Sequence, residues 1–217
     1  DQATVRINPP QSDLADVRAA VVRRRERLAA NRAATQDDCY MADGKRIEVV
    51  ANLGGPADVA VALESGAEGC GLMRSEFLFL NRTSAPSEDE QYAQYQAIAD
   101  GLKGRPLIIR LLDVGGDKTA SYLPIGPEEN PALGVRGVRV LMRRPQVLKT
   151  QLRAILRGAP HAKIMVPMVA SLSELRAVRA ALDEARREMG RVGRSDLGVM
   201  IETPAAAAIA DLLAEEG

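Results

Sequence analysis

The stretch KIMVPMVASLSELRAVRAALDEARREM, residues 163–189, decides the fold, because it joins a short apolar run to a long amphipathic segment. The run Lys163–Pro167 is typical of a buried β-strand, and Ser171–Met189 is typical of a surface helix. The same succession of strand and helix occurs five times after residue 45. This alternation predicts parallel strands that are joined and covered by helices, which is an α/β fold.

The other four units differ mainly in the connection between strand and helix. They are residues 47–52 with 56–65, 69–74 with 87–101, 106–112 with 145–157, and 196–202 with 204–216. The connection in the third of these holds a long loop and the irregular stretch 131–142. A closed (β/α)8 barrel needs eight units and about 250 residues, so this chain reaches about five. Two alternatives remain: an open, doubly wound sheet, or a partial (β/α)8 TIM-type barrel.

The first 40 residues follow another pattern. The alternating stretch Thr4–Asn8 ends at two prolines and is typical of the last strand of a domain. Ser12 and Asp13 can cap a helix that runs to about Ala34. The predicted domains are therefore 1–10, the end of a preceding domain; 11–40, a linker helix; and 41–217, the α/β part.

The composition of the 217-residue chain is that of a soluble globular protein, with 46% hydrophobic and 27% charged residues. The 29 lysines and arginines balance the 29 aspartates and glutamates, so no net charge attracts the whole chain to nucleic acid or to a membrane surface. No run approaches the roughly 18 apolar residues of a membrane helix, and no signal peptide is apparent. We therefore expect a cytoplasmic protein with no nucleic-acid partner and no membrane partner.

Few residues are available for nucleophilic or transition-metal chemistry. The one histidine, His161, lies between a predicted helix and a predicted strand, where we expect a surface loop. Cys39 and Cys70 are not in a CxxC motif, and Cys70 is expected in the core. The chemistry that remains is that of arginine, carboxylate and glycine.

Three predicted strands end in charged residues. Arg74 ends the second strand, Arg110 the third and Glu202 the fifth. Ligands of parallel α/β folds bind outside the carboxyl ends of the strands, so these side chains are expected at one edge. Two guanidinium groups suit a small ligand with two or three negative charges. A Mg²⁺ ion would offset the repulsion between that ligand and Glu202.

Each candidate also has a purely structural interpretation. Arg74 could form an ion pair with Glu76, and Arg110 could form one with Asp113. Glu202 could lie in the first turn of the next helix, where a negative charge meets the helix dipole.

Weaker candidates come from the loops. Lys118, after the turn Gly115–Gly116, could contact a phosphate or could be a solvated loop lysine. Asn52 and Arg136 are candidates of similar rank. The glycine-rich loops match neither GxxxxGK[ST] nor GxGxxG, so they give little support to a nucleotide site.

Six motifs carry a resemblance to a known family. They are, in order, GAEGCGLMRSEFLF, IIRLLDVGGDK, EENPALGVRGVRV, QLRAILR, IMVPMVASLSEL and GVMIETPAAA. Together they resemble the phosphoenolpyruvate-binding domain of enzyme I of the bacterial sugar phosphotransferase system, from about residue 45 to 217. Residues 1–10 resemble the last strand of the family's swivelling phosphohistidine domain, and 11–40 its connecting helix. More distant relatives, phosphoenolpyruvate synthase and pyruvate phosphate dikinase, typically have a histidine where this chain has Phe77.

The resemblance implies a (β/α)8 barrel that binds phosphoenolpyruvate and Mg²⁺ at its carboxyl edge. Arg74 and Arg110 would hold the phosphate and the carboxylate, and Glu202 would ligate the metal. The family passes the phosphoryl group to an enzyme histidine and then to the carrier protein HPr in sugar uptake. We expect a homodimer in the intact protein.

The resemblance also places some functional residues outside this chain. In the family, the reactive histidine lies before residue 1, and a second metal carboxylate, another arginine and a proton-donating cysteine lie after residue 217. We therefore expect no catalytic residue here and interpret the chain as a fragment. Two hypotheses follow: part of a phosphoenolpyruvate-protein phosphotransferase, or a catalytically incomplete module of a multidomain phosphoryl-transfer protein that acts as a binding or dimerisation scaffold.

Overall fold

The computed structural model describes residues 7–35, 37–116, 120–131, 133–190 and 196–217. The chain divides into two compact units, residues 1–48 and 49–217. The first unit holds the helix α1 and a two-stranded antiparallel pair. Their bounds are Gln11–Ala34 for α1, Cys39–Tyr40 for β1 and Arg46–Ile47 for β2.

The extent of α1 agrees with the predicted helix, but its cap does not. Pro10 occupies the N-cap position and makes no side-chain capping hydrogen bond. Ser12 lies inside the helix, with its hydroxyl 3.5 Å from the carboxylate of Asp13. No residue of α1, all of which is described, is buried. Most of the predicted strand Thr4–Asn8 lies outside the described residues.

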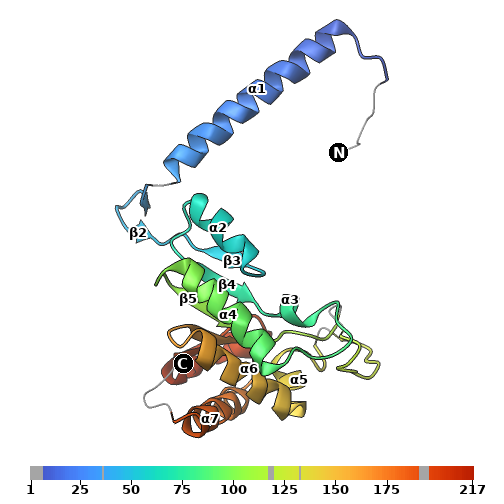
Figure 1. The fold of residues 1–217 in the computed structure, drawn as a ribbon, viewed down its shortest axis with the longest axis vertical. Helices are drawn as coiled ribbons and strands as arrows, with labels where there is room; N and C mark the ends of the chain where they lie inside the picture. The colour runs from blue at the N-terminus through green and yellow to red at the C-terminus, as the bar shows by residue number, and fades with distance from the viewer. Residues whose placement is uncertain (1–6, 36, 117–119, 132, 191–195) are drawn as a thin grey trace. The chain divides into compact units, whose positions relative to one another are not determined.

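The second unit is built on a five-stranded parallel sheet whose strands follow one another in chain order (Figure 1). The strands are β3 (Ala51–Leu53), β4 (Cys70–Arg74), β5 (Leu107–Arg110), β6 (Lys163–Val166) and β7 (Leu197–Val199). The helices are α2 (Ala57–Glu64), α3 (Glu76–Phe79), α4 (Glu88–Leu102), α5 (Val138–Arg143), α6 (Pro145–Gly158), α7 (Leu172–Glu188), α8 (Pro204–Ala208) and α9 (Ala210–Glu216).

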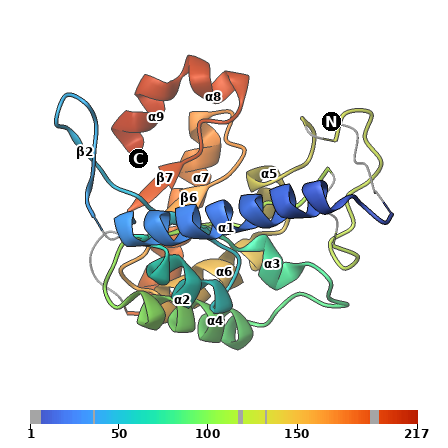
Figure 2. The same cartoon turned by 90° about the horizontal axis from the view of Figure 1, so that it is seen from above.

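The order of the helices decides between the two predicted architectures. Each of α2, α4, α6, α7 and α9 contacts the next, in the same order as the strands. The last pair, α8 and α9, follows β7 at the end of the sheet (Figure 2). A doubly wound sheet would reverse its strand order at a switch point, whereas a barrel adds each strand beside the previous one. The partial (β/α)8 barrel of about five units is therefore confirmed.

Helix α6 shows how the sequence fixes this arrangement. Its amphipathic pattern buries seven residues, which include Leu152 and Ile155 at no more than 1% exposure. Burial of one such side chain stabilises the fold by roughly 1.5–3 kcal/mol. Gly158 allows close approach to α4, because a Cβ atom there would lie 2.6 Å from the carbonyl oxygen of Tyr92. The pairing of α6 with α4 is thus set by both apolar burial and the lack of a side chain.

A polar contact inside this layer links α6 to the sheet. The Gln151 side chain accepts from the backbone N–H of Leu112 at 3.0 Å and donates to the hydroxyl of Tyr95 at 3.1 Å. Burial raises the pKa of Tyr95, so the hydroxyl stays protonated. The amide therefore fixes α6 against the segment that follows β5.

Several element boundaries differ from the predictions. The predicted strand 47–52 is divided: Ile47 ends β2, and β3 begins only at Ala51, because Gly44 closes the β1–β2 turn at φ +83°. The stretch 131–142 was expected to be irregular, but it contains most of α5. The last predicted helix is broken at Ile209, whose φ of −124° is not helical. The one-turn helix α3 was not predicted.

Candidate functional site

The last residues of β4 and β5 are Arg74 and Arg110, and the two are paired residues in the register of these neighbouring strands. Both line a cavity of about 400 Å³. The other residues that line it are Leu72, Glu76, Phe77, Leu80 and Met200. The structure thus brings the two predicted arginines to one cavity at the carboxyl edge of the sheet.

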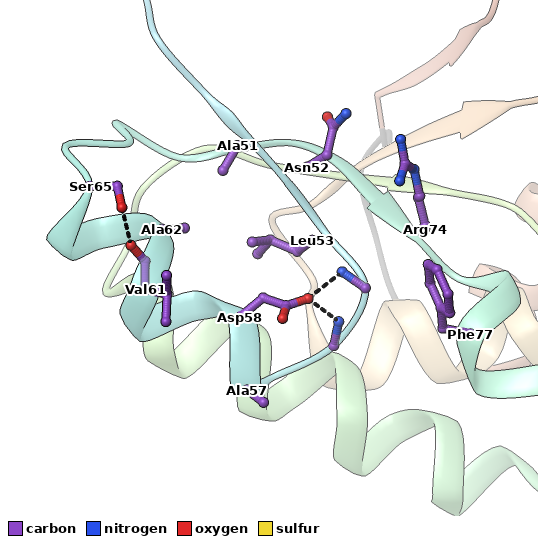
Figure 3. Close-up of a pocket in the computed structure, with 12 residues that line it drawn as sticks. Ala51, Asn52, Leu53, Ala57, Asp58, Val61, Ala62, Ser65, Arg74 and Phe77 are labelled. Atoms are coloured by element: carbon purple, nitrogen blue, oxygen red, sulfur yellow. Dashed lines mark hydrogen bonds between the residues drawn. The ribbon is translucent and has the colours of Figure 1, made fainter. Parts of the chain in front are cut away.

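Arg74 is exposed and also borders a larger cavity of about 710 Å³ beside β3 and α2. The side chains of Asn52 and Arg74 extend the same way, with the ring of Phe77 next to Arg74 (Figure 3). At the base of this cavity, Asp58 accepts the backbone N–H of Gly54 at 2.7 Å, which shapes the loop after β3. Among the described residues, Arg74 forms no ion pair. The alternative pairing of Arg74 with Glu76 is therefore wrong.

Arg110 has the opposite surroundings, because it is buried, with 6% of its surface exposed. Its Nη2 donates to Oε1 of Glu76 at 2.5 Å, and Glu76 is only 1% exposed. Its Nη1 lies 3.6 Å from Oδ2 of Asp113 and 3.8 Å from Sδ of Met200. The predicted pairing of Arg110 with Asp113 is present, but Glu76 is the closer carboxylate.

A further arginine, Arg136, extends these contacts into a row of alternating charges. Arg136 donates to both carboxylate oxygens of Asp113, at 3.0 and 3.1 Å. Gly115 makes this approach possible, because its φ is +122° and a Cβ atom would lie 2.6 Å from the carbonyl oxygen of Val135. The row therefore runs Glu76, Arg110, Asp113, Arg136, with two charges of each sign; the first three residues are buried and Arg136 is half-buried. A bidentate arginine–carboxylate pair adds geometric specificity as well as interaction energy.

Glu202 lies after β7, at the same edge of the sheet, but it is not one of the residues that line the cavity of Arg74 and Arg110. Its Oε1 accepts the backbone N–H of Met168, which follows β6, at 2.7 Å. Thr203 is the N-cap of α8, so Glu202 precedes the helix. The alternative position of Glu202 in the first helical turn is therefore wrong.

The described residues offer few ligands for a magnesium ion. They contain no group of three or more histidine, cysteine, aspartate or glutamate side chains that could hold a metal. Glu202 is exposed at the edge of the sheet, and its Oε1 already accepts a hydrogen bond, so Oε2 is the oxygen available to a cation. Mg²⁺ commonly uses one or two carboxylates and completes its shell with phosphate oxygens and water. One carboxylate agrees with that mode of binding and would not make a metal site without the ligand.

The remaining candidates have different positions. Lys118 lies outside the described residues. His161 is exposed in the turn before β6, as predicted, and Cys70 is fully buried. Burial raises the pKa of the Cys70 thiol to about 11, so this thiol is not reactive. Within the described residues, no helix is both long and apolar enough to cross a membrane.

Sequence reasoning missed the roles of Glu76 and Met200. Glu76 was considered only as a partner of Arg74, two residues away. The turn of α3 instead directs it to Arg110, on the next strand. A carboxylate just after one strand-end arginine and near another was the available signal, but its direction depends on a helix of four residues.

Known proteins match this chain over most of its length. A family model described as "PEP-utilising enzyme, PEP-binding domain" matches residues 28–217. The chain is 49% identical over 214 residues to a multiphosphoryl transfer protein of Xanthomonas campestris pv. campestris, with 96% of this chain and 25% of that protein covered. It is 42% identical over 182 residues to the phosphoenolpyruvate-protein phosphotransferase of Staphylococcus carnosus, with 81% of this chain and 32% of that protein covered.

The fold is that of a partial α/β barrel with two arginines at the carboxyl edge of its sheet. The chain belongs to the family of PEP-utilising enzymes and matches its PEP-binding domain. Its named relatives are transferases. The chain spans about a quarter to a third of their length. Enzymes of this family generally depend on Mg²⁺.

Proposed function

We propose that this chain binds phosphoenolpyruvate at the carboxyl edge of its sheet and is the ligand-binding part of a phosphoenolpyruvate-protein phosphotransferase. The observation that carries the proposal is the pairing of Arg74 with Arg110 on neighbouring strands, with both residues lining one cavity. A small ligand with a phosphate and a carboxylate has one anionic group for each arginine. Phosphoryl transfer needs positioned positive charge and little covalent chemistry from the protein.

The two arginines have separate tasks in this proposal. Arg74, exposed and without an ion pair among the described residues, supplies the net charge that attracts the ligand. Arg110 is fixed from two sides and supplies directed N–H groups. The Sδ atom of Met200 is a weak hydrogen-bond acceptor, so a ligand oxygen would replace it easily at Nη1 of Arg110.

Glu202 would hold the magnesium ion through its free oxygen. Bound there, Mg²⁺ would neutralise phosphate charge. The hydrogen bond from Met168 keeps the carboxylate of Glu202 in place before any ligand arrives. Lys118 remains a proposed further phosphate contact.

The later steps of the proposed function involve residues outside this chain. The phosphoryl group would pass to a histidine of a swivelling domain and then to an HPr-type carrier protein in sugar uptake. The intact protein would be a cytoplasmic homodimer. The support for these proposals is the similarity to proteins named phosphoenolpyruvate-protein phosphotransferase and multiphosphoryl transfer protein.

One observation favours a second candidate, a scaffold that binds no phosphoenolpyruvate. Glu76 and Asp113 offset the charge of Arg110 and Arg136, which favours a purely structural role for this row. In that case Arg74 would be the one arginine, among the described residues that line the cavity, with charge left for a ligand. The scaffold hypothesis predicts that the affinity of this edge for phosphoenolpyruvate is no higher than that of an exposed arginine elsewhere on the surface.

Titration calorimetry separates the two candidates. The intact protein that carries this chain is titrated with phosphoenolpyruvate in the presence and absence of Mg²⁺. The proposal predicts saturable binding that Mg²⁺ strengthens and that Arg74→Met and Glu202→Gln weaken. Arg187→Met is the matched control, because Arg187 is exposed and lies at the end of α7. An absence of heat at millimolar ligand, with folded protein, would favour the scaffold.

A further inference from the structure

Glu76 is a buried carboxylate next to a cavity for which an anion is proposed. Its surface is 1% exposed, and it belongs to α3, the single turn that follows β4. It lines the same cavity as Arg74 and Arg110. A negative charge in this position repels an anionic ligand. A role for Glu76 in this site therefore requires another effect that favours the ligand.

The contact between Glu76 and Arg110 indicates that this effect is the orientation of the guanidinium. Oε1 of Glu76 accepts Nη2 of Arg110 at 2.5 Å, while Asp113 lies 3.6 Å from Nη1 on the other branch of the guanidinium. A hydrogen bond on one branch and an ion pair on the other restrict the rotation of the planar guanidinium and hold its position. Without Glu76, the guanidinium could rotate about its long side chain.

The charges of the row lead to the same conclusion. Glu76, Arg110, Asp113 and Arg136 contribute two positive and two negative charges, so the row adds little net attraction for an anion. The contribution of Arg110 to a ligand would then be the direction of its N–H groups. Arg74, which the row does not neutralise, would provide the attraction.

We propose that Glu76 is a positioning residue that orients the guanidinium of Arg110 toward the ligand, at the expense of net positive charge in the cavity. This inference rests on the proposed function, because it assumes an anionic ligand between the two arginines. It assigns a role to the glutamate of the motif MRSEF that is separate from the role of the arginine in the same motif.

The substitution Glu76→Gln tests the inference, because glutamine keeps the size and one acceptor oxygen but removes the charge. In the intact protein, we expect the dissociation constant for phosphoenolpyruvate to stay within about threefold of wild type or to fall, since the cavity becomes more positive. The rate of phosphoryl transfer per folded molecule should fall about 10- to 100-fold, as when a partner that orients a binding group is lost. Glu215→Gln, in the exposed part of α9, is the matched control.

A second measurement does not depend on activity. In ligand-free protein with ¹⁵N-labelled arginine, restricted rotation should give separate Nη signals for Arg110, which Arg110→Lys identifies by their loss. The signals should merge through faster rotation in Glu76→Gln. Unchanged signals together with an unchanged rate would overturn the inference, and so would a rate loss caused entirely by weaker binding.

The failure of the proposed function would be visible separately. If wild-type protein does not bind phosphoenolpyruvate, both proposals fail; if it binds and Glu76→Gln behaves like wild type, only the positioning role fails. Should Glu76→Gln not fold, Glu76→Asp replaces it, because aspartate keeps the charge and shortens the side chain by one methylene. The inference predicts a lower transfer rate for Glu76→Asp with unchanged affinity, and a wild-type rate would overturn it.

Discussion

Arg74 and Arg110 end neighbouring strands and are register partners, yet their surroundings differ completely. Arg74 is exposed and has no ion pair among the described residues. Arg110 is 6% exposed and lies between the carboxylates of Glu76 and Asp113. In the proposed function, these two equivalent positions at the edge of the sheet divide the work of anion recognition. One arginine offers net charge to solvent, and the other offers donors whose direction is fixed.

The buried arginine should matter most for stability. Arg110→Met removes the guanidinium that pairs with the buried carboxylate of Glu76. Breaking a buried ion pair by removing one partner costs about 3–5 kcal/mol, and we expect a loss of that size in the free energy of unfolding. Urea denaturation would measure it, with Arg187→Met as the control. A loss for Arg110→Met as small as that for Arg187→Met would contradict the structural role of the pair.

The loop that brings Arg136 to Asp113 is the next most sensitive feature. Gly115→Ala would place a Cβ atom 2.6 Å from the carbonyl oxygen of Val135 at a φ of +122°. Strain of this kind costs about 1–3 kcal/mol, before any steric clash is included. We expect a lower midpoint of thermal unfolding, measured by circular dichroism. Gly126→Ala is a matched control, because a Cβ atom at Gly126 meets nothing within 4 Å and its φ is not positive. Equal midpoints for the two variants would show that the loop tolerates the change.

These two predictions concern contacts that the sequence reveals only in part. The strand-end positions of Arg74 and Arg110 are predictable, because parallel strands that begin on one side of a sheet must end together. The pairing of Glu76 with Arg110 is not, since it depends on the direction of one turn of helix. The division of the predicted strand 47–52 was missed for a similar reason, because the turn at Gly44 pairs Ile47 with β1. Short elements follow tertiary contacts more than local propensity.

The exposed arginine should affect binding and leave stability nearly unchanged. Arg74→Met removes a charge from the surface and no ion pair of the described residues, so the free energy of unfolding should change by no more than about 0.5 kcal/mol. Loss of a charge-assisted hydrogen bond worth about 1.5–3 kcal/mol would weaken phosphoenolpyruvate binding by roughly 10- to 100-fold. Calorimetry and urea denaturation on the same variant give both values. A large loss of stability with unchanged affinity would reverse the roles assigned to the two arginines.

An exposed ion pair at the start of α4 provides the smallest effect and a contrast with the buried pair. The backbone N–H of Ser87, followed by the side chain of Arg82, lowers the pKa of Glu90 to about 2. Because the folded pKa is below the unfolded value, the stability from Glu90 is present above about pH 4.5 and is lost as the pH falls toward 2. We expect Glu90→Gln to reduce this acid dependence in thermal unfolding. Arg82→Met should reduce it less, because the hydrogen bond from Ser87 remains. An equal effect of both substitutions would contradict the larger contribution of the cap.

The most direct test of the two-arginine site is a crystal structure of the intact protein with phosphoenolpyruvate. We predict that Arg74 and Nη1 of Arg110 each lie within about 3.2 Å of a ligand oxygen. Nη2 of Arg110 should remain on the carboxylate of Glu76. A ligand bound elsewhere, or one that contacts Arg74 while Arg110 keeps Met200 as its neighbour, would contradict the account.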